Sequence, residues 1–288
     1  MESSRSDNLR EVVYTPESPL RHPRLLVQSM WQDLLASREL AWRLMVRDIR
    51  AQYRQSILGI LWAFLPPMAM AMVFVILNSR NLINIGETNI PYTAFAMFGT
   101  VLWQVFVDSL NGPLKIVTAS KPVLAKINIP KEALILSAIG QTLFNVGIKL
   151  LILLVVFVIY DMPLGWGTPF SLLALLVLVL LGTTFGLLLT PVGILYTDIA
   201  QGLVLATGLW FFITPVVYPP PTTFPFSLLA TLNPVSPILV GARDLATQGV
   251  LYNPIPFFVV TVLMLGVLFI TWVFYRLAIP ILVERMSA

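Results

Sequence analysis

Long apolar stretches alternate with short charged ones along most of this chain. Runs without a charged residue extend over residues 55–79, 88–107, 133–148, 162–197, 199–242 and 245–275. A helix of about 20 apolar residues crosses the hydrocarbon core of a bilayer. The pattern therefore predicts six transmembrane helices, which we place near residues 57–78, 91–113, 133–159, 170–193, 200–217 and 255–277.

The second half of the fifth uncharged run is rich in proline and reads YPPPTTFPFSLLATLNPVSP. Seven prolines lie between Pro215 and Pro237. Proline has no backbone N–H, and a helix exposed to lipid must satisfy all of its backbone polar groups. We therefore expect a re-entrant helical segment, buried against other helices, between spans five and six. A plain extracellular loop is the alternative.

A row of arginines stands immediately before the first predicted span. Arg43, Arg47, Arg50 and Arg54 fall on one face of a helix, while aromatic and aliphatic residues gather mainly on another face. The pattern predicts an amphipathic helix over residues 31–54 that lies along the membrane interface. These arginines are either a generic basic anchor or a binding surface for an anionic substrate or a partner subunit, since a guanidinium can bind two phosphate oxygens.

The basic residues also predict how the chain is oriented. Fifteen of the 18 Lys and Arg residues lie before span one, between spans two and three, or after span six. Because basic residues concentrate on the cytoplasmic side of a membrane, both termini are expected in the cytoplasm. We divide the chain into a cytoplasmic N-terminal segment, the interface helix and a transmembrane domain, over residues 1–30, 31–54 and 55–288.

The composition favours a membrane protein without its own catalytic centre. The chain is 57% hydrophobic and 11% charged, whereas soluble domains carry about 25% charged residues. It has no cysteine and one histidine, His22, so no thiolate site, metal site or His-based triad is expected. The phosphate-loop motif G-x-x-x-x-G-K-[ST] is absent, which excludes ATP hydrolysis by that route.

Two charged residues fall within the predicted spans. Asp108 lies in span two and Lys149 lies about midway along span three. Because an intramembrane charge usually faces a cavity or a partner, the two side chains could form an ion pair if these spans are neighbours. A structural ion pair and a substrate contact are equally compatible with the sequence.

Five segments, in the same order along the chain, carry a resemblance to a known family. They are RDIRAQYRQSILGILWAFLPP, VLAKINIPKE, LYTDIAQG, FFITPVVYPP and LNPVSPILVGARDLATQG. The set resembles the membrane subunits of type-2 ABC exporters for lipid-linked polysaccharides, which serve O-antigen, capsule and teichoic acid export. Thr197 departs from the pattern, because an arginine is expected before Asp198.

The resemblance implies a transport subunit rather than an enzyme. It implies a homodimer in the bacterial cytoplasmic (inner) membrane, docked on two copies of a separate ATPase subunit that binds ATP and Mg²⁺. The chain itself would bind no cofactor and no nucleic acid. Its partners would be membrane lipids and its cargo, a polysaccharide linked to a polyprenyl pyrophosphate.

The resemblance also assigns roles to particular residues. Contacts with the ATPase subunit would come from Arg43, Arg47, Asp48, Lys126, Pro130, Lys131, Glu132 and Asp198. The pyrophosphate would meet Arg50 and Arg54. The channel for the sugars would be lined by Trp103, Phe106, Trp210, Phe211, Phe212 and Tyr218, although Trp and Tyr also gather at membrane interfaces without such a role.

Three other functions remain compatible with the sequence. An ABC-2 exporter of a lipid or a drug would share the fold. A proton-coupled transporter would need several intramembrane carboxylates and usually an internal repeat. A polyprenyl-phosphate transferase would need clustered acidic or histidine residues at the membrane edge, whereas Glu87 and Asp161 occur singly.

Overall fold

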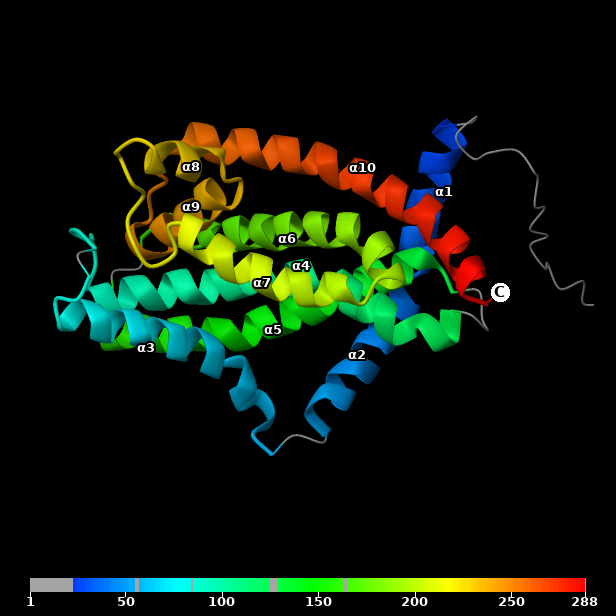
Figure 1. Ribbon diagram of the computed structural model, residues 1–288, viewed down its shortest axis with the longest axis horizontal. Helices are drawn as coiled ribbons and strands as arrows, with labels where there is room; N and C mark the ends of the chain where they lie inside the picture. The colour runs from blue at the N-terminus through cyan, green and yellow to red at the C-terminus, as the bar shows by residue number, and fades with distance from the viewer. Residues whose placement is uncertain (1–22, 55–56, 84, 125–128, 163–164, 288) are drawn as a thin grey trace, which may run out of the picture.

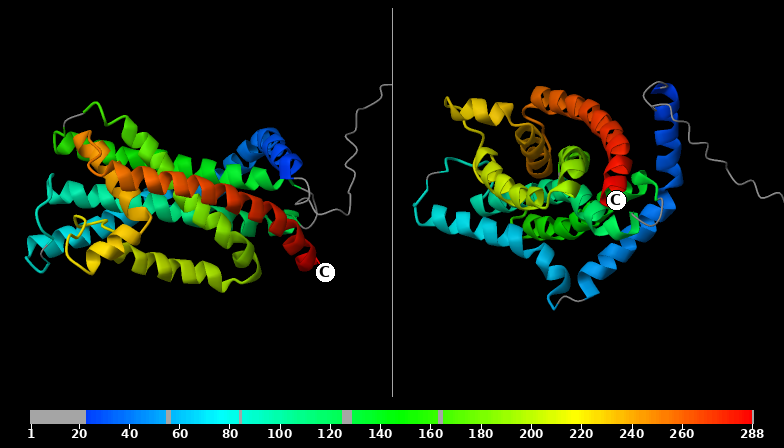
Figure 2. Two further views of the ribbon diagram at one scale, coloured as in Figure 1. Left: turned by 90° about the horizontal axis from the view of Figure 1, so that it is seen from above. Right: turned by 45° about the vertical axis from the view of Figure 1, so that its right-hand side comes forward.

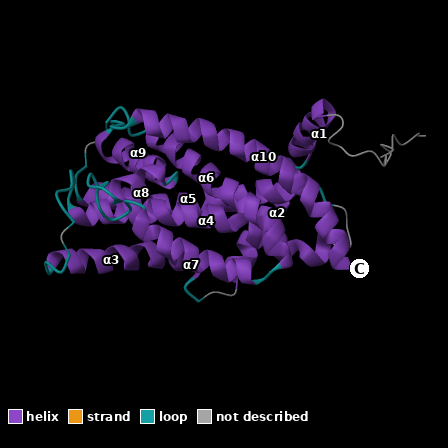
Figure 3. Cartoon of the chain, turned by 45° about the horizontal axis from the view of Figure 1, so that its top comes forward, coloured by secondary structure: helices purple, strands orange, loops and turns teal. Residues whose placement is uncertain are grey.

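The structure, a computed structural model, describes residues 23–54, 57–83, 85–124, 129–162 and 165–287. Within these residues the chain is helical and contains no strand, as the sequence predicts (Figure 3). The elements, labelled in Figure 1, are α1 (Pro23–Ala36), α2 (Arg38–Arg54), the 3₁₀ helix η2 (Gly59–Ala63), α3 (Leu65–Ser79), α4 (Tyr92–Leu124), α5 (Lys131–Ile159), α6 (Phe170–Leu195), α7 (Asp198–Ile213), α8 (Phe226–Leu232), α9 (Val235–Gln248) and α10 (Pro254–Ser287).

Helices α4, α5, α6 and α10 run along the long axis of the molecule, with α3 and α7 beside them (Figure 1). In the part of the chain that the structure describes, four helical segments are long and apolar enough to cross a membrane. These are Tyr92–Pro122, Lys131–Ile159, Phe170–Leu195 and Pro254–Leu282. Helices α3 and α7 are apolar but have only 15 and 16 residues. The prediction of six spans is therefore supported for four of them and remains a prediction for the first and fifth.

Glycines on α6 bring this helix close to α4, against which it packs. A Cβ atom added at Gly186 would lie 2.4 Å from the Leu110 carbonyl oxygen. One added at Gly182 would lie 2.7 Å from the Phe106 carbonyl oxygen. Both distances are too short for a side chain, so glycine is what lets these two backbones approach each other.

The second half of the proline-rich stretch forms α8 and the start of α9, and α9 packs against α6 and α10. Arg243 on α9 is buried, donates hydrogen bonds to the carbonyl oxygens of Pro215 (3.3 Å) and Val216 (3.0 Å), and lies 3.7 Å from the centre of the Phe95 ring. These contacts fix α9 to the stretch that follows α7 and to α4. Helix α9 is thus packed against the bundle, whereas residues 214–225 are not helical and most of α8 is exposed. That the segment is re-entrant stays a prediction.

The amphipathic helix begins earlier than residue 31 and consists of two parts. It starts at Pro23, and proline favours the first position of a helix because its missing N–H would have no partner there. Ser37 divides it into α1 and α2, and each part has its own buried apolar residues. Both parts lie at the end of the bundle that carries the C-terminus (Figure 2).

Replacement of Gly186 by alanine tests the close packing of α4 and α6. Overpacking typically costs about 1–3 kcal/mol, so Gly186→Ala should lower the midpoint of thermal unfolding of the detergent-purified protein by several degrees. Gly266→Ala on α10 is the matched control, because an added Cβ there meets no atom within 4 Å. Equal unfolding temperatures for the two variants would contradict this account of the α4–α6 contact.

Candidate functional site

Helix α2 carries its arginines on an exposed face, while its opposite side packs against α5. Arg43 is paired with Glu39, one turn earlier, at 2.6 Å. The Arg47 side chain donates to Asp48 at 2.7 Å, and Asp48 also accepts a hydrogen bond from Gln141 of α5 at 3.1 Å. Asp48 therefore joins the arginine face to the transmembrane bundle.

Arg50 and Arg54 differ from the other two arginines of the row. Both side chains are exposed, and within the described residues neither guanidinium has a hydrogen-bond or ion-pair partner. They lie in the last two turns of α2 and line an open hollow together with Trp42, Val46 and Ala51. This end of α2 therefore presents two guanidinium groups that are free to bind an anion.

The residues expected to contact an ATPase subunit gather at one end of the molecule. The end of α4, the start of α5, the α6–α7 turn and the C-terminus lie at the same end of the bundle as α1 and α2 (Figure 1). Pro130 precedes α5 and is exposed, and Lys131 begins that helix. Asp198 is exposed at the start of α7, and Lys126 lies outside the described residues.

Glu132 does not fit the expectation of an exposed contact. Its side chain is only 2% exposed and is paired with Arg276 of α10 at 2.5 Å. The same guanidinium binds Asp33 of α1 at 2.5 Å and Ser29 at 3.3 Å. Glu132 therefore joins α5 to α10 within the chain, and its side chain is not exposed for docking. No local sequence pattern indicates this network, because its members lie on three separate elements.

Three of the six expected channel-lining aromatics are buried inside the chain. Trp103, Phe106 and Phe211 belong to the main hydrophobic core. The ring centres of Trp103 and Phe106 are 5.3 Å apart, and those of Trp103 and Phe211 are 5.9 Å apart. These side chains pack α4 against α7, so in this structure they are core residues and do not line an open surface.

The remaining three aromatics lie nearer the surface. Trp210 is half-buried and donates from its indole N–H to the Asn233 side chain at 3.0 Å. Phe212 is 64% exposed, and the Tyr218 hydroxyl donates to the backbone carbonyl of Phe212 at 2.7 Å. Phe212 is therefore the member of the predicted set whose ring is most available to a bound molecule.

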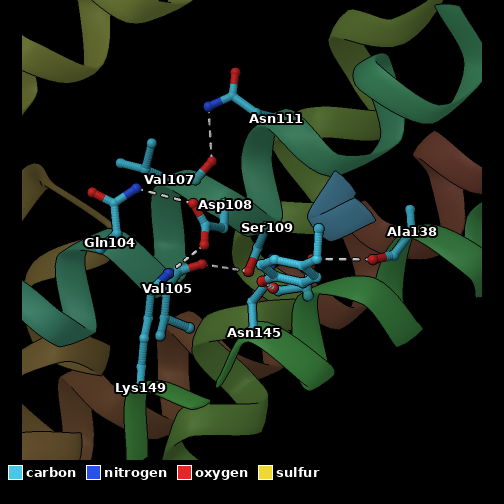
Figure 4. Close-up of polar contacts among 11 residues, drawn as sticks. Gln104, Val105, Val107, Asp108, Ser109, Asn111, Ala138, Asn145 and Lys149 are labelled. Atoms are coloured by element: carbon cyan, nitrogen blue, oxygen red, sulfur yellow. Dashed lines mark hydrogen bonds and ion pairs between the residues drawn. The ribbon is translucent and has the colours of Figure 1, made fainter. Parts of the chain in front are cut away.

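The two intramembrane charges form an ion pair, one of the two arrangements expected from the sequence. The Lys149 ammonium contacts Asp108, and Asp108 also accepts a hydrogen bond from Gln104 at 2.9 Å (Figure 4). The Lys149 side chain is 3% exposed and that of Asp108 is 27% exposed. The carboxylate thus neutralises an ammonium group that has almost no access to solvent.

This ion pair lies in the wall of a polar cavity of about 310 Å³ between α2, η2, α3, α4 and α5. Carboxamide side chains dominate its polar lining, and they come from Gln52, Gln104, Asn111, Gln141 and Asn145. Lys115 also lines it, as do Tyr53 and Trp62. Burial, with a smaller contribution from the Asp108 carboxylate, raises the pKa of the Tyr53 phenol, which therefore stays protonated at neutral pH.

This cavity was not predicted from the sequence, because the predictions were based on charged and aromatic residues, whereas most of its polar lining is uncharged, with carboxamides the commonest group. A usable signal was present. Residues 104, 108, 111 and 115 are all polar and recur at helical spacing on α4, and so do residues 141, 145 and 149 on α5. Residues three and four positions apart share a helix face, so each series marks one polar stripe in an apolar helix.

The fold and the site define a helical membrane protein with a basic amphipathic helix at one end. Comparison with known proteins identifies its family. The profile of the ABC-2 type transporter family matches residues 39–246. A protein of Myxococcus xanthus named O-antigen export system permease protein RfbA is 30% identical over 218 residues, which cover 73% of this chain and 81% of that protein.

Two proteins of Klebsiella pneumoniae with the same name are 25% and 24% identical over 214 residues, and each alignment covers 71% of this chain and 79% of the relative. The chain belongs to the ABC-2 type transporter family. It is accordingly a multi-pass transmembrane subunit of an ABC transporter and is not itself the ATPase. The family resemblance found in the sequence is confirmed.

Single and double substitutions test the ion pair. Breaking a buried pair by removing one partner costs about 3–5 kcal/mol, because the other charge is left uncompensated. Asp108→Asn should destabilise the purified protein more than Lys149→Met, since Lys149 is the more deeply buried partner. Thermal unfolding in detergent measures the difference. The double variant Asp108→Asn/Lys149→Met should recover much of the loss, and strictly additive losses would refute the pairing.

Proposed function

We propose that this chain is the membrane subunit of an ATP-driven exporter that moves an O-antigen-like polysaccharide, linked to a polyprenyl pyrophosphate, across the bacterial inner membrane. The relatives named O-antigen export system permease protein, which align with more than two thirds of the chain, support the class of cargo. The observation that carries the proposal is the pair of unpartnered guanidiniums of Arg50 and Arg54 at the end of the interface helix.

The pyrophosphate group explains why two arginines are placed there. A guanidinium donates hydrogen bonds in a planar fork that matches phosphate oxygens, and such charge-assisted bonds are stronger than neutral ones. Arg50 and Arg54 project from the same short stretch of α2, which leads into the first apolar helix, α3. A lipid-linked anion entering from the inner leaflet would therefore meet them with its lipid already beside the apolar bundle.

The driving force comes from a separate subunit in this proposal. ATP and Mg²⁺ are bound by two copies of an ATPase, which dock on a homodimer of this chain with both termini in the cytoplasm. The exposed docking residues are Arg43, Arg47 and Pro130, together with Asp198 at the start of α7. Lys131 and Asp48 lie beside them, and Lys126 belongs to the same predicted segment.

We call the end of the bundle that carries α1, α2, the start of α5 and the α6–α7 turn the docking end. The contacts within the chain provide a route for motion from the docking end to the spans. Asp48 joins α2 to Gln141 of α5. Arg276 joins α1 to both α5 and α10 through Asp33 and Glu132. A displacement of α1 and α2 by the ATPase therefore pulls on two of the long helices at once. The sugars then leave through a channel between the protomers, where the Phe212 ring is available to stack on them.

Removal of the two unpartnered arginines tests the headgroup site. Arg50→Ala/Arg54→Ala should reduce export at least about tenfold, because hydrogen bonds to charged groups contribute about 1.5–3 kcal/mol each and 1.4 kcal/mol corresponds to a factor of ten. Export is measured as ATP-dependent transfer of lipid-linked polysaccharide in inverted membrane vesicles that contain the ATPase subunit.

The control for this test is Arg38→Ala, which removes an exposed arginine from the other end of α2. The conservative variant Arg50→Lys/Arg54→Lys should retain part of the activity, since it keeps the charge but loses the fork. All variants should assemble with the ATPase subunit. Wild-type export by the double alanine variant would show that the headgroup binds elsewhere.

Charge reversal tests the docking end. Asp198→Arg should lower the amount of ATPase subunit that co-purifies with the chain by about tenfold, because a wrong charge at a contact costs several kcal/mol. Glu87→Arg is the matched control, since Glu87 is also exposed but lies in the segment between α3 and α4, at the opposite end of the bundle. Undiminished co-purification with Asp198→Arg would remove the α6–α7 turn from the docking surface.

A further inference from the structure

The polar cavity between α2, η2, α3, α4 and α5 is not used by the headgroup site or the docking end. Its volume of about 310 Å³ lies within the range of small-molecule binding sites. It opens beside the last two turns of α2, because Gln52 and Tyr53 line it. Arg50 and Arg54 belong to the same two turns of α2 but line the separate hollow on its exposed face, so the cavity and the proposed pyrophosphate site share one end of the helix and no lining residue.

The carboxamides of the cavity have hydrogen-bonding groups to spare. Within the residues that the structure describes, Asn111 uses its N–H₂ on the Val107 carbonyl oxygen, and Gln141 uses its N–H₂ on Asp48. Their amide oxygens are left without a donor. Asn145 accepts a 3.4 Å hydrogen bond from Tyr53, and its N–H₂ group is left without an acceptor.

This mixture of free donors and acceptors matches a particular ligand chemistry. A hydroxyl group both donates and accepts hydrogen bonds, and a sugar presents several of them around one ring. Phosphate alone would require donors only, whereas the cavity offers carboxamide oxygens as well. The ion pair of Asp108 and Lys149 cancels its own charge, so the inner wall is polar and close to neutral.

Two residues at the rim of the cavity, Trp62 and Lys115, also suit a sugar linked to a phosphate. The Trp62 ring is 58% exposed and offers a flat face on which a sugar ring can stack. Lys115 is exposed and has no partner among the described residues, and it lies two helical turns from Asp108 on α4. It therefore adds one positive charge at the cytoplasmic side of an otherwise neutral cavity.

We propose that this cavity binds the sugar that is attached to the pyrophosphate of the cargo. The carboxamides of Asn111, Gln141 and Asn145 bind its hydroxyls, Trp62 stacks on its ring, and Lys115 faces the phosphate that joins sugar to lipid. The inference rests on the proposed function, because it takes the cargo to be a lipid-linked glycan. It adds that each protomer recognises the first sugar before transport begins.

Equilibrium binding to the full-length chain in lipid nanodiscs tests the inference. The probes are farnesyl pyrophosphate and its glucosyl, galactosyl and N-acetylglucosaminyl derivatives. At least one glycosylated probe should bind the wild-type protein about tenfold or more tightly than farnesyl pyrophosphate, since several hydrogen bonds are gained. Asn111→Leu and Asn145→Leu should each weaken that probe about fivefold or more and leave farnesyl pyrophosphate unchanged.

Gln32→Leu is the matched control, because it removes an exposed amide from α1, outside the cavity, and should change neither affinity. If one cavity variant fails to fold, the other still decides the question, and the wild-type comparison needs no variant. Equal binding of all four probes would overturn the inference and leave the proposed function standing, provided that Arg50→Ala/Arg54→Ala weakens farnesyl pyrophosphate.

Two further outcomes are distinguishable. Cavity variants that weaken farnesyl pyrophosphate and the glycosylated probe by the same factor would overturn the inference, since their effect would be on structure rather than on sugar binding. Failure of the wild-type protein to bind any of the four probes would overturn the proposed headgroup site together with the inference.

Discussion

Three charged side chains in the described part of this protein are buried, and each is compensated by other groups of the chain. These contacts join the helices of the fold. Lys149 is neutralised by Asp108, and Glu132 by Arg276. Arg243 has two backbone carbonyl oxygens and the Phe95 ring around it. Each of these three side chains joins its own helix to another helix. In lipid the hydrophobic effect holds helices together less specifically, because lipid tails are as apolar as the side chains of a neighbouring helix.

The lengths of the uncharged runs predicted the four longest helices well, because crossing a bilayer demands continuous apolar sequence. The pair of Asp108 and Lys149 was also within reach of the sequence, since isolated charges in apolar helices need a partner. The Arg276 network was not. Arg276 lies 144 residues from Glu132 and 243 residues from Asp33, and no local pattern encodes such distances.

The aromatic residues show a different limit of sequence reasoning. Residue type alone indicated flat rings that could stack on sugars. In the structure Trp103 and Phe106 contact each other and are buried within the chain, while Phe212 is exposed. Which side of a helix faces a neighbour depends on how the helices are rotated against each other, and residue type alone does not specify that rotation. The polar stripes of α4 and α5 were visible as helical spacing, yet only the structure shows that the two stripes face one cavity.

The ion pairs that Arg276 forms with Asp33 and Glu132 have a consequence for biogenesis. Helix α1 is synthesised early, but the guanidinium that binds it belongs to α10 and emerges from the ribosome 243 residues after Asp33. Until then, Glu132 lacks its counter-ion. A chain that stops before α10 therefore has an unmatched acidic group in the first turn of α5, which distinguishes an unfinished protein from a finished one.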